Sequence, residues 1–90
     1  MPSYTPPLRD MQFVLNELLE LPQVLKTLPA HAETDTDTIS AVLQEGGKFA
    51  AQVLFPLNAS GDQQGCHWDR ETRAVKTPDG FKEAFAQFAA

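Results

Sequence analysis

Two adjacent residues, Cys66 and His67, are the first candidates for chemistry, because a thiolate beside an imidazole can be a nucleophile or a metal ligand. Structural zinc sites take about four ligands, usually with paired spacings, whereas this chain has one cysteine and two histidines, His31 and His67. A nucleophilic cysteine needs a base placed by the fold, and adjacent residues rarely achieve this. We therefore expect no metal site and no catalytic thiol, and we interpret Cys66 as a partly buried structural residue.

Acidic residues are the other candidates. Asp69, Glu71 and Asp79 occur close together in the sequence and resemble carboxylates that could serve in acid–base catalysis. They fall in a polar stretch, however, where acidic side chains are usually solvated. The sequence has no G-x-G-x-x-G motif and no P-loop, and Gly46-Gly47 lies inside a helical pattern. The residues alone predict no catalytic, cofactor-binding or metal-binding site.

The composition narrows the class of protein. Ninety residues make at most one domain or a piece of one, and a hydrophobic content of 42% is ordinary for a globular chain. The net charge of −5 argues against nucleic acid or an anionic membrane as a partner. A single cysteine rules out an internal disulfide, and we see neither a signal peptide nor a membrane span. We expect a cytoplasmic protein.

Apolar periodicity predicts the helices of the first half. Leucines and a methionine mark one face of a helix over residues 8–21, which Pro22 interrupts. A short second helix over about 24–28 should end before Pro29. A polar linker follows, in which Asp35 and the three residues after it offer side-chain oxygens as N-caps.

The longest predicted helix spans about residues 38–55 and forms the core element. Its apolar residues recur at steps of three and four, and we expect four of them to be buried: Ile39, Val42, Phe49 and Val53. The central Gly46-Gly47 costs about 1 kcal/mol per glycine relative to alanine. Either another element approaches closely at Gly46, or the helix is merely weak or bent. Pro56 then kinks or ends it.

The last third combines loop signals with an aromatic helix. Residues 58–65 have a loop composition, and residues 66–77 suggest a short hairpin or an irregular excursion. Thr77, as N-cap, and Pro78, at the first position, predict the start of the last helix. That helix carries an apolar stripe at i, i+3, i+4 and i+7: Phe81, Ala84, Phe85 and Phe88. The predicted fold is all-α, with three to four helices and a long irregular loop before the last.

The stripe has two interpretations. It packs on the core helix, or it binds a partner. No glycine, asparagine, proline or basic residue follows Phe88, so the usual signals that end a helix are missing. We expect a chain cut from a longer one, which exposes apolar surface and self-associates through this stripe.

Three segments in a fixed order carry a resemblance: PLRDMQFVLNELL, EGGKFAAQVLFPLNASGDQQGC and VKTPDGFKEAFAQF. Together they resemble the N-terminal region of bacterial FAD-dependent acyl-CoA dehydrogenases, from Pro7 to Phe88. KFAAQVLFPLN followed by GD is similar to the first helix of that family's α-domain. PLRDMQFVL and TPDGFKEAF narrow the likeness to the long subfamily, which has an extra N-terminal helical segment.

The resemblance implies an N-terminal arm and helical extension over residues 1–34, and the first helices of an incomplete α-domain over 35–90. Such an enzyme removes hydrogens from the α and β carbons of an acyl-CoA thioester, as in fatty acid β-oxidation. A glutamate takes the proton, FAD takes the hydride, and an electron-transfer flavoprotein reoxidises the flavin. In the family the motifs for flavin, CoA and base lie downstream, and Glu45, Glu71 and Glu83 match none of them.

Two hypotheses follow. In the first, the chain is the N-terminal structural piece of an acyl-CoA dehydrogenase, packs against the remainder of that enzyme, and is inactive and free of flavin by itself. In the second, it is an autonomous helical interaction or oligomerisation module whose aromatic stripe binds a partner.

Overall fold

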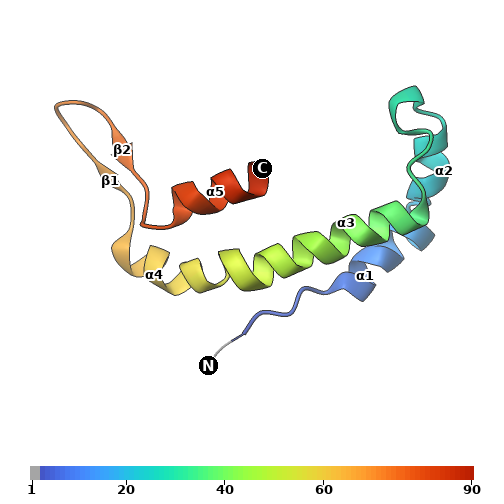
Figure 1. Ribbon diagram of the computed structural model, residues 1–90, viewed down its shortest axis with the longest axis horizontal. Helices are drawn as coiled ribbons and strands as arrows, with labels where there is room; N and C mark the ends of the chain where they lie inside the picture. The colour runs from blue at the N-terminus through green and yellow to red at the C-terminus, as the bar shows by residue number, and fades with distance from the viewer. Residues whose placement is uncertain (1–2) are drawn as a thin grey trace. The chain divides into compact units, whose positions relative to one another are not determined.

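The computed structural model in Figure 1 describes residues 3–90 and is mainly helical, which confirms the predicted all-α class. Two of its helical segments, η1 and η3, are π-helical, and η2 is a short 3-10 helix. The elements in chain order are α1 (Leu8–Gln12), η1 (Phe13–Leu18), α2 (Leu21–Lys26), η2 (Pro29–His31), α3 (Thr36–Phe49), η3 (Ala50–Leu54), α4 (Pro56–Gln64), β1 (His67–Trp68), β2 (Val75–Lys76) and α5 (Phe81–Ala89).

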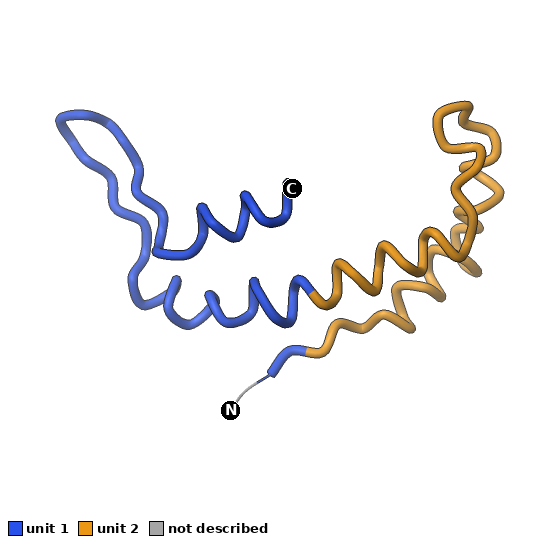
Figure 2. The backbone as a smooth tube through the Cα atoms, in the orientation of Figure 1, with its two compact units in different colours: residues 1–4, 49–90 blue, residues 5–48 orange. Residues whose placement is uncertain are grey.

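The chain forms two compact units, which Figure 2 distinguishes by colour. One unit is Thr5–Lys48, and the other combines Phe49–Ala90 with the start of the chain as far as Tyr4. The division therefore falls at the end of α3. The boundary between residues 34 and 35, which the resemblance implies, stays a prediction.

The first helical segment ends earlier than predicted. η1 stops at Leu18, and the N–H of Leu19 donates to the carbonyl of Val14 at 2.8 Å. Glu20 then takes a left-handed conformation with φ of 49°, and α2 begins next to it with Pro22 in its first turn. Because proline has no N–H with which to extend a preceding helix, the chain turns before Pro22. The predicted helix over 8–21 is thus too long by three residues.

The N-cap of α3 is Asp35, one of the four capping candidates in the sequence. Oδ1 of Asp35 accepts hydrogen bonds from the N–H and from the hydroxyl of Thr38, both at 2.8 Å, which is the usual N-cap pattern. These two bonds hold the pKa of the Asp35 carboxyl below its usual value of 3.8, the backbone N–H being the larger cause. The structure therefore selects Asp35 from the four candidates.

The buried face of α3 differs from the predicted face at Val42. Ile39 is 8% exposed, whereas Val42 is 65% exposed. The packed face follows the row Ile39, Leu43 and Gly47, spaced at four residues. Val42 precedes Leu43 by one position, which is about 100° around the helix. The prediction that Val42 is buried is wrong, and Phe49 and Val53, in the other unit, are half-buried.

The close approach expected at Gly46 occurs instead at its neighbour, Gly47. A Cβ atom built on Gly47 would lie 3.1 Å from Cγ of Pro6 and 3.3 Å from Cδ2 of Leu8, whereas nothing lies within 4 Å of one built on Gly46. Gln12 of α1 also donates to the hydroxyl of Ser40 at 3.1 Å. The segment that leads into α1 therefore packs on α3 at Gly47.

Residues 58–64 are helical, so the loop predicted over 58–65 is wrong for all but its last residue. α4 starts at Pro56, where the missing N–H costs nothing, and ends before Gly65, whose φ is 67°. Gly61, inside α4, is buried against the ring of Phe81. This packing outweighs the weak helix propensity of the asparagine, serine, glycine and aspartate in the segment.

α5 starts later than predicted and has no side-chain cap. It begins at Phe81, after Gly80 with φ of 91°, so the prediction of Thr77 as N-cap and Pro78 as first residue is wrong. A Cβ atom on Gly80 would lie 2.7 Å from Cδ2 of Leu57. A glycine is required there because the backbone is left-handed and close to α4.

Candidate functional site

The residues first considered for chemistry lie on an exposed antiparallel hairpin of β1 and β2. His67 pairs with Lys76, and Trp68 pairs with Val75. Cys66 precedes the hairpin and is exposed, so its interpretation as partly buried is wrong. Over residues 3–90, no group of three or more histidine, cysteine or acidic side chains is arranged to hold a metal ion.

Asp69 stabilises the hairpin turn. Its Oδ1 accepts the N–H of Glu71 at 2.8 Å and that of Thr72 at 3.1 Å. These bonds, with Thr72 contributing most, hold the pKa of the Asp69 carboxyl below its usual value. Arg73 completes the turn with a left-handed φ of 62°. The Asp69 carboxylate is thus bound to its own backbone.

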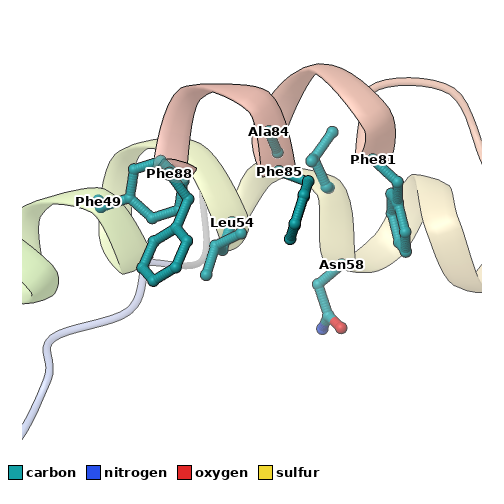
Figure 3. A pocket seen from close by; sticks show the side chains of 8 residues that line it. Phe49, Leu54, Asn58, Phe81, Ala84, Phe85 and Phe88 are labelled. Atoms are coloured by element: carbon teal, nitrogen blue, oxygen red, sulfur yellow. The ribbon is translucent and has the colours of Figure 1, made fainter. Parts of the chain in front are cut away.

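The strongest candidate site is an apolar groove between α5 and the helical segment that contains η3 and α4, called here the α5 groove (Figure 3). Its cavity volume is about 430 Å³. Eight residues line it: Phe49, Leu54, Leu57, Asn58, Phe81, Ala84, Phe85 and Phe88. Asn58 is the one polar residue among them, and its amide points away from α5 in Figure 3.

Two contacts, one at each end of α5, hold the groove together. The Phe88 ring lies 5.7 Å from the Phe49 ring, centroid to centroid, at an interplanar angle of 53°, a favourable geometry for aromatic pairs. At the other end Phe81 lies over Gly61. Since Phe88 meets the start of the segment and Phe81 its end, α5 runs antiparallel to it.

The residues of the stripe on α5 differ in how far they are buried. Ala84 is 5% exposed, whereas Phe85 and Phe88 are each 72% exposed. All four residues of the predicted stripe therefore line one groove, as their spacing implied. On the opposite wall, Phe49 and Leu57 belong to the apolar pattern of the core helix on which the stripe was expected to pack, whereas Leu54 and Asn58 were not predicted, because residue 58 was placed in a loop.

The chain is similar, over nearly its whole length, to part of the acyl-CoA dehydrogenases, which confirms the resemblance inferred from its sequence. The 3-methylmercaptopropionyl-CoA dehydrogenase of Ruegeria pomeroyi is 35% identical over 86 residues, which is 96% of this chain and 14% of that enzyme. The butyryl-CoA dehydrogenase of Syntrophomonas wolfei is 32% identical over 84 residues, which is 92% of this chain and 14% of that enzyme.

The chain thus spans about a seventh of the length of these curated relatives. No protein-family model matches it. None of the helices in the described part of the chain is both long enough and apolar enough to cross a membrane.

Proposed function

We propose that this chain is a non-catalytic helical segment of an acyl-CoA dehydrogenase, which packs against the helical domain of that enzyme. The observation that carries the proposal is the α5 groove, in which Phe85 and Phe88 are each 72% exposed, in a chain similar to one seventh of two such enzymes. Exposed apolar patches on soluble proteins commonly mark interaction sites.

The whole enzyme would remove hydrogens from the α and β carbons of an acyl-CoA thioester. FAD would accept the hydride, and an electron-transfer flavoprotein would be the partner that reoxidises it. The names of the two relatives specify 3-methylmercaptopropionyl-CoA and butyryl-CoA, so the substrate class is an acyl-CoA thioester. Within residues 3–90 we assign no residue to flavin, to CoA or to the catalytic base.

A chimera tests this proposal. The chain would replace the matching segment of the Ruegeria enzyme, and flavin content and acyl-CoA dehydrogenation would be measured beside the parent enzyme and a variant with the segment deleted. We expect a yellow, active chimera, a deletion variant that loses soluble enzyme, and a colourless, inactive 90-residue chain.

Stoichiometric FAD on the isolated chain would contradict the non-catalytic role. The same exposed groove also fits the alternative of an autonomous interaction module. A chimera without flavin, together with an isolated chain that folds stably and captures a separate partner through Phe85 and Phe88, would favour that alternative.

A further inference from the structure

The π-helical segment η3 ends at a contact with the start of the chain. The N–H of Phe55 donates to the carbonyl of Ala50, five residues back, at 2.8 Å, and this bond makes the turn wider than an α-helical turn. The ring of the same Phe55 stacks on the ring of Tyr4, with 6.2 Å between the ring centroids and an interplanar angle of 19°. Phe55 therefore connects the width of this turn to the position of the N-terminal segment.

The width of the turn also determines whether α5 can make the contacts at both of its ends. Phe88 meets Phe49, which comes just before η3, and Phe81 lies over Gly61, twelve positions after Phe49. In a regular α-helix, twelve positions would leave Phe49 and Gly61 about 120° apart around the axis, whereas a wide turn that takes up one extra residue leaves them about 20° apart. Both residues face α5 only in the second case.

The sequence of η3 permits an α-helical form as well as the π-helical form. Residues 50–54 are alanine, glutamine, valine and leucine, which an α-helix accommodates, and π-helical turns are rare. Pro56 disturbs a regular α-helix through its contact with the carbonyl four residues back, but a kink relieves this disturbance as well as a wide turn does. A contact from outside the helix must therefore select the form of the turn.

We propose that Tyr4 selects the π-helical form of η3 and thereby holds the end of α5 on Phe49. Stacking of Tyr4 on Phe55 stabilises the wide turn, and the wide turn places Phe49 within reach of Phe88. When the N-terminal segment is released, η3 takes the α-helical form and the end of α5 separates from Phe49. The N-terminal segment is thus a strap that opens or closes one end of the α5 groove.

The start of α5 stays on α4 in this transition, because the contacts made there all involve residues after η3. Gly80 approaches Leu57, and Phe81 approaches Gly61. The whole device lies within the compact unit that combines the start of the chain with Phe49–Ala90. It does not depend on the proposed function.

Nuclear magnetic resonance of the isotope-labelled 90-residue chain tests the proposal. Tyr4→Ala removes the stacked ring, whereas Tyr4→Phe keeps a ring that can stack. Thr5→Ala, at an exposed neighbouring position, is the matched control. We expect Tyr4→Ala to change the form of η3, and Tyr4→Phe and Thr5→Ala to leave it as it is.

Two quantities report the form of the turn. The first is the ratio of the couplings through the hydrogen bond from the nitrogen of Phe55 to the carbonyl carbons of Ala50 and Ala51, because an α-helical turn would move this bond to Ala51. The second is the nuclear Overhauser effect between the rings of Phe49 and Phe88. An aromatic stack shifts an equilibrium by roughly two- to tenfold, so we expect the coupling ratio to fall by this factor in Tyr4→Ala. The Overhauser effect should fall with it.

A substitution at the other end tests the same coupling in reverse, since coupling between two sites is reciprocal. Phe88→Ala should weaken the Overhauser effect between the rings of Tyr4 and Phe55 and lower the same coupling ratio. Gln87→Ala, an exposed position off the stripe, should change neither. Because Phe88 is 72% exposed, this variant remains informative where Tyr4→Ala fails to fold.

A π-helical turn that persists unchanged in a folded Tyr4→Ala variant, or in Phe88→Ala, would overturn the proposal. Loss of the wide turn in Pro56→Ala, with no change in Tyr4→Ala, would assign the turn to the proline. An effect of Thr5→Ala as large as that of Tyr4→Ala would show that the stacked ring is not the cause.

Discussion

The ring of Phe81 lies directly against Gly61: a Cβ atom built on this glycine would be 2.7 Å from Cζ and 2.8 Å from Cε1 of the ring. α4 and α5 approach this closely only because Gly61 has no side chain. We expect Gly61→Ala to lower the free energy of unfolding by about 1–3 kcal/mol, the usual cost of overpacking. Urea denaturation followed by circular dichroism would measure it.

A second substitution checks the cause of that loss. Phe81→Leu removes the ring, so the cost of Gly61→Ala should be smaller in a Phe81→Leu background, with a measurable coupling between the two positions. If Gly61→Ala instead stabilised the protein by about 1 kcal/mol, as helix propensity alone would predict, α5 would not rest on α4 at this glycine.

The adjacent glycines of α3 should respond differently to alanine. Nothing lies within 4 Å of a Cβ atom on Gly46, whereas one on Gly47 would lie 3.1 Å from Pro6. We expect Gly46→Ala to stabilise the chain by about 0.5–1 kcal/mol through helix propensity, and Gly47→Ala to stabilise it less or to destabilise it. Equal effects in thermal unfolding would show that the N-terminal segment does not pack on α3.

The corrected face of α3 gives a further matched pair. Ile39 is 8% exposed and Val42 is 65% exposed. Ile39→Ala should therefore cost about 2–4 kcal/mol, while Val42→Ala should change the free energy of unfolding by about 0.5 kcal/mol or less. Chemical denaturation of the two variants would measure both free energies of unfolding. A larger loss of stability in Val42→Ala than in Ile39→Ala would show that Val42 lies on the buried face, as the sequence predicted.

Because the carboxylate of Asp35 caps α3, we expect the stability of this helix to depend on pH. Its pKa is lower in the folded chain than its usual value of 3.8, so the folded state favours the charged form. The stabilisation by the charged cap is complete at a pH above the usual pKa of about 3.8. It is lost as the pH falls through the lower pKa that Asp35 has in the folded chain. Asp35→Asn keeps a capping oxygen without the charge and should remove this part of the pH dependence.

Helicity measured by circular dichroism between neutral and strongly acidic pH would test this. The pKa of the Asp69 carboxyl is also lowered by hydrogen bonds to its own turn, and so Asp69→Asn is the matched control. A profile that changed with Asp69→Asn and not with Asp35→Asn would show that the acid transition belongs to the hairpin turn and not to α3.

Local signals in the sequence were sufficient for the helices whose ends depend on nearby residues. Asp35 lies immediately before α3 and caps it, and Pro22 marks the break between the first two helical segments. The stripe on α5 lines one groove because its spacing alone determines the face. These features need only three or four neighbouring residues, which is the range that a sequence pattern describes.

Features decided by distant contacts could not be predicted in this way. The local sequence around Gly61 predicts a loop, but in the structure Gly61 lies in a helix and packs against the ring of Phe81, twenty positions later. Thr77 and Pro78 offer a good helix start, yet the contact of Gly80 with Leu57 delays α5 to residue 81. In both cases a tertiary contact outweighs a preference worth about 1 kcal/mol or less.

The π-helical turn of η3 determines the angle around the helix axis between Phe49, before it, and the residues of α4, after it. The N–H of Phe55 donates to the carbonyl of Ala50, five residues back, at 2.8 Å, so this turn holds one residue more than an α-helical turn. One residue advances a helix by about 100°. Deleting a residue from this segment, with the π-helical turn kept, would rotate Phe49, which meets Phe88, out of line with Leu57 and Gly61, which meet Gly80 and Phe81, while barely altering the composition of the helix. Within Ala50–Leu54, the number of residues therefore matters to the groove as much as the identity of Leu54, which lines it.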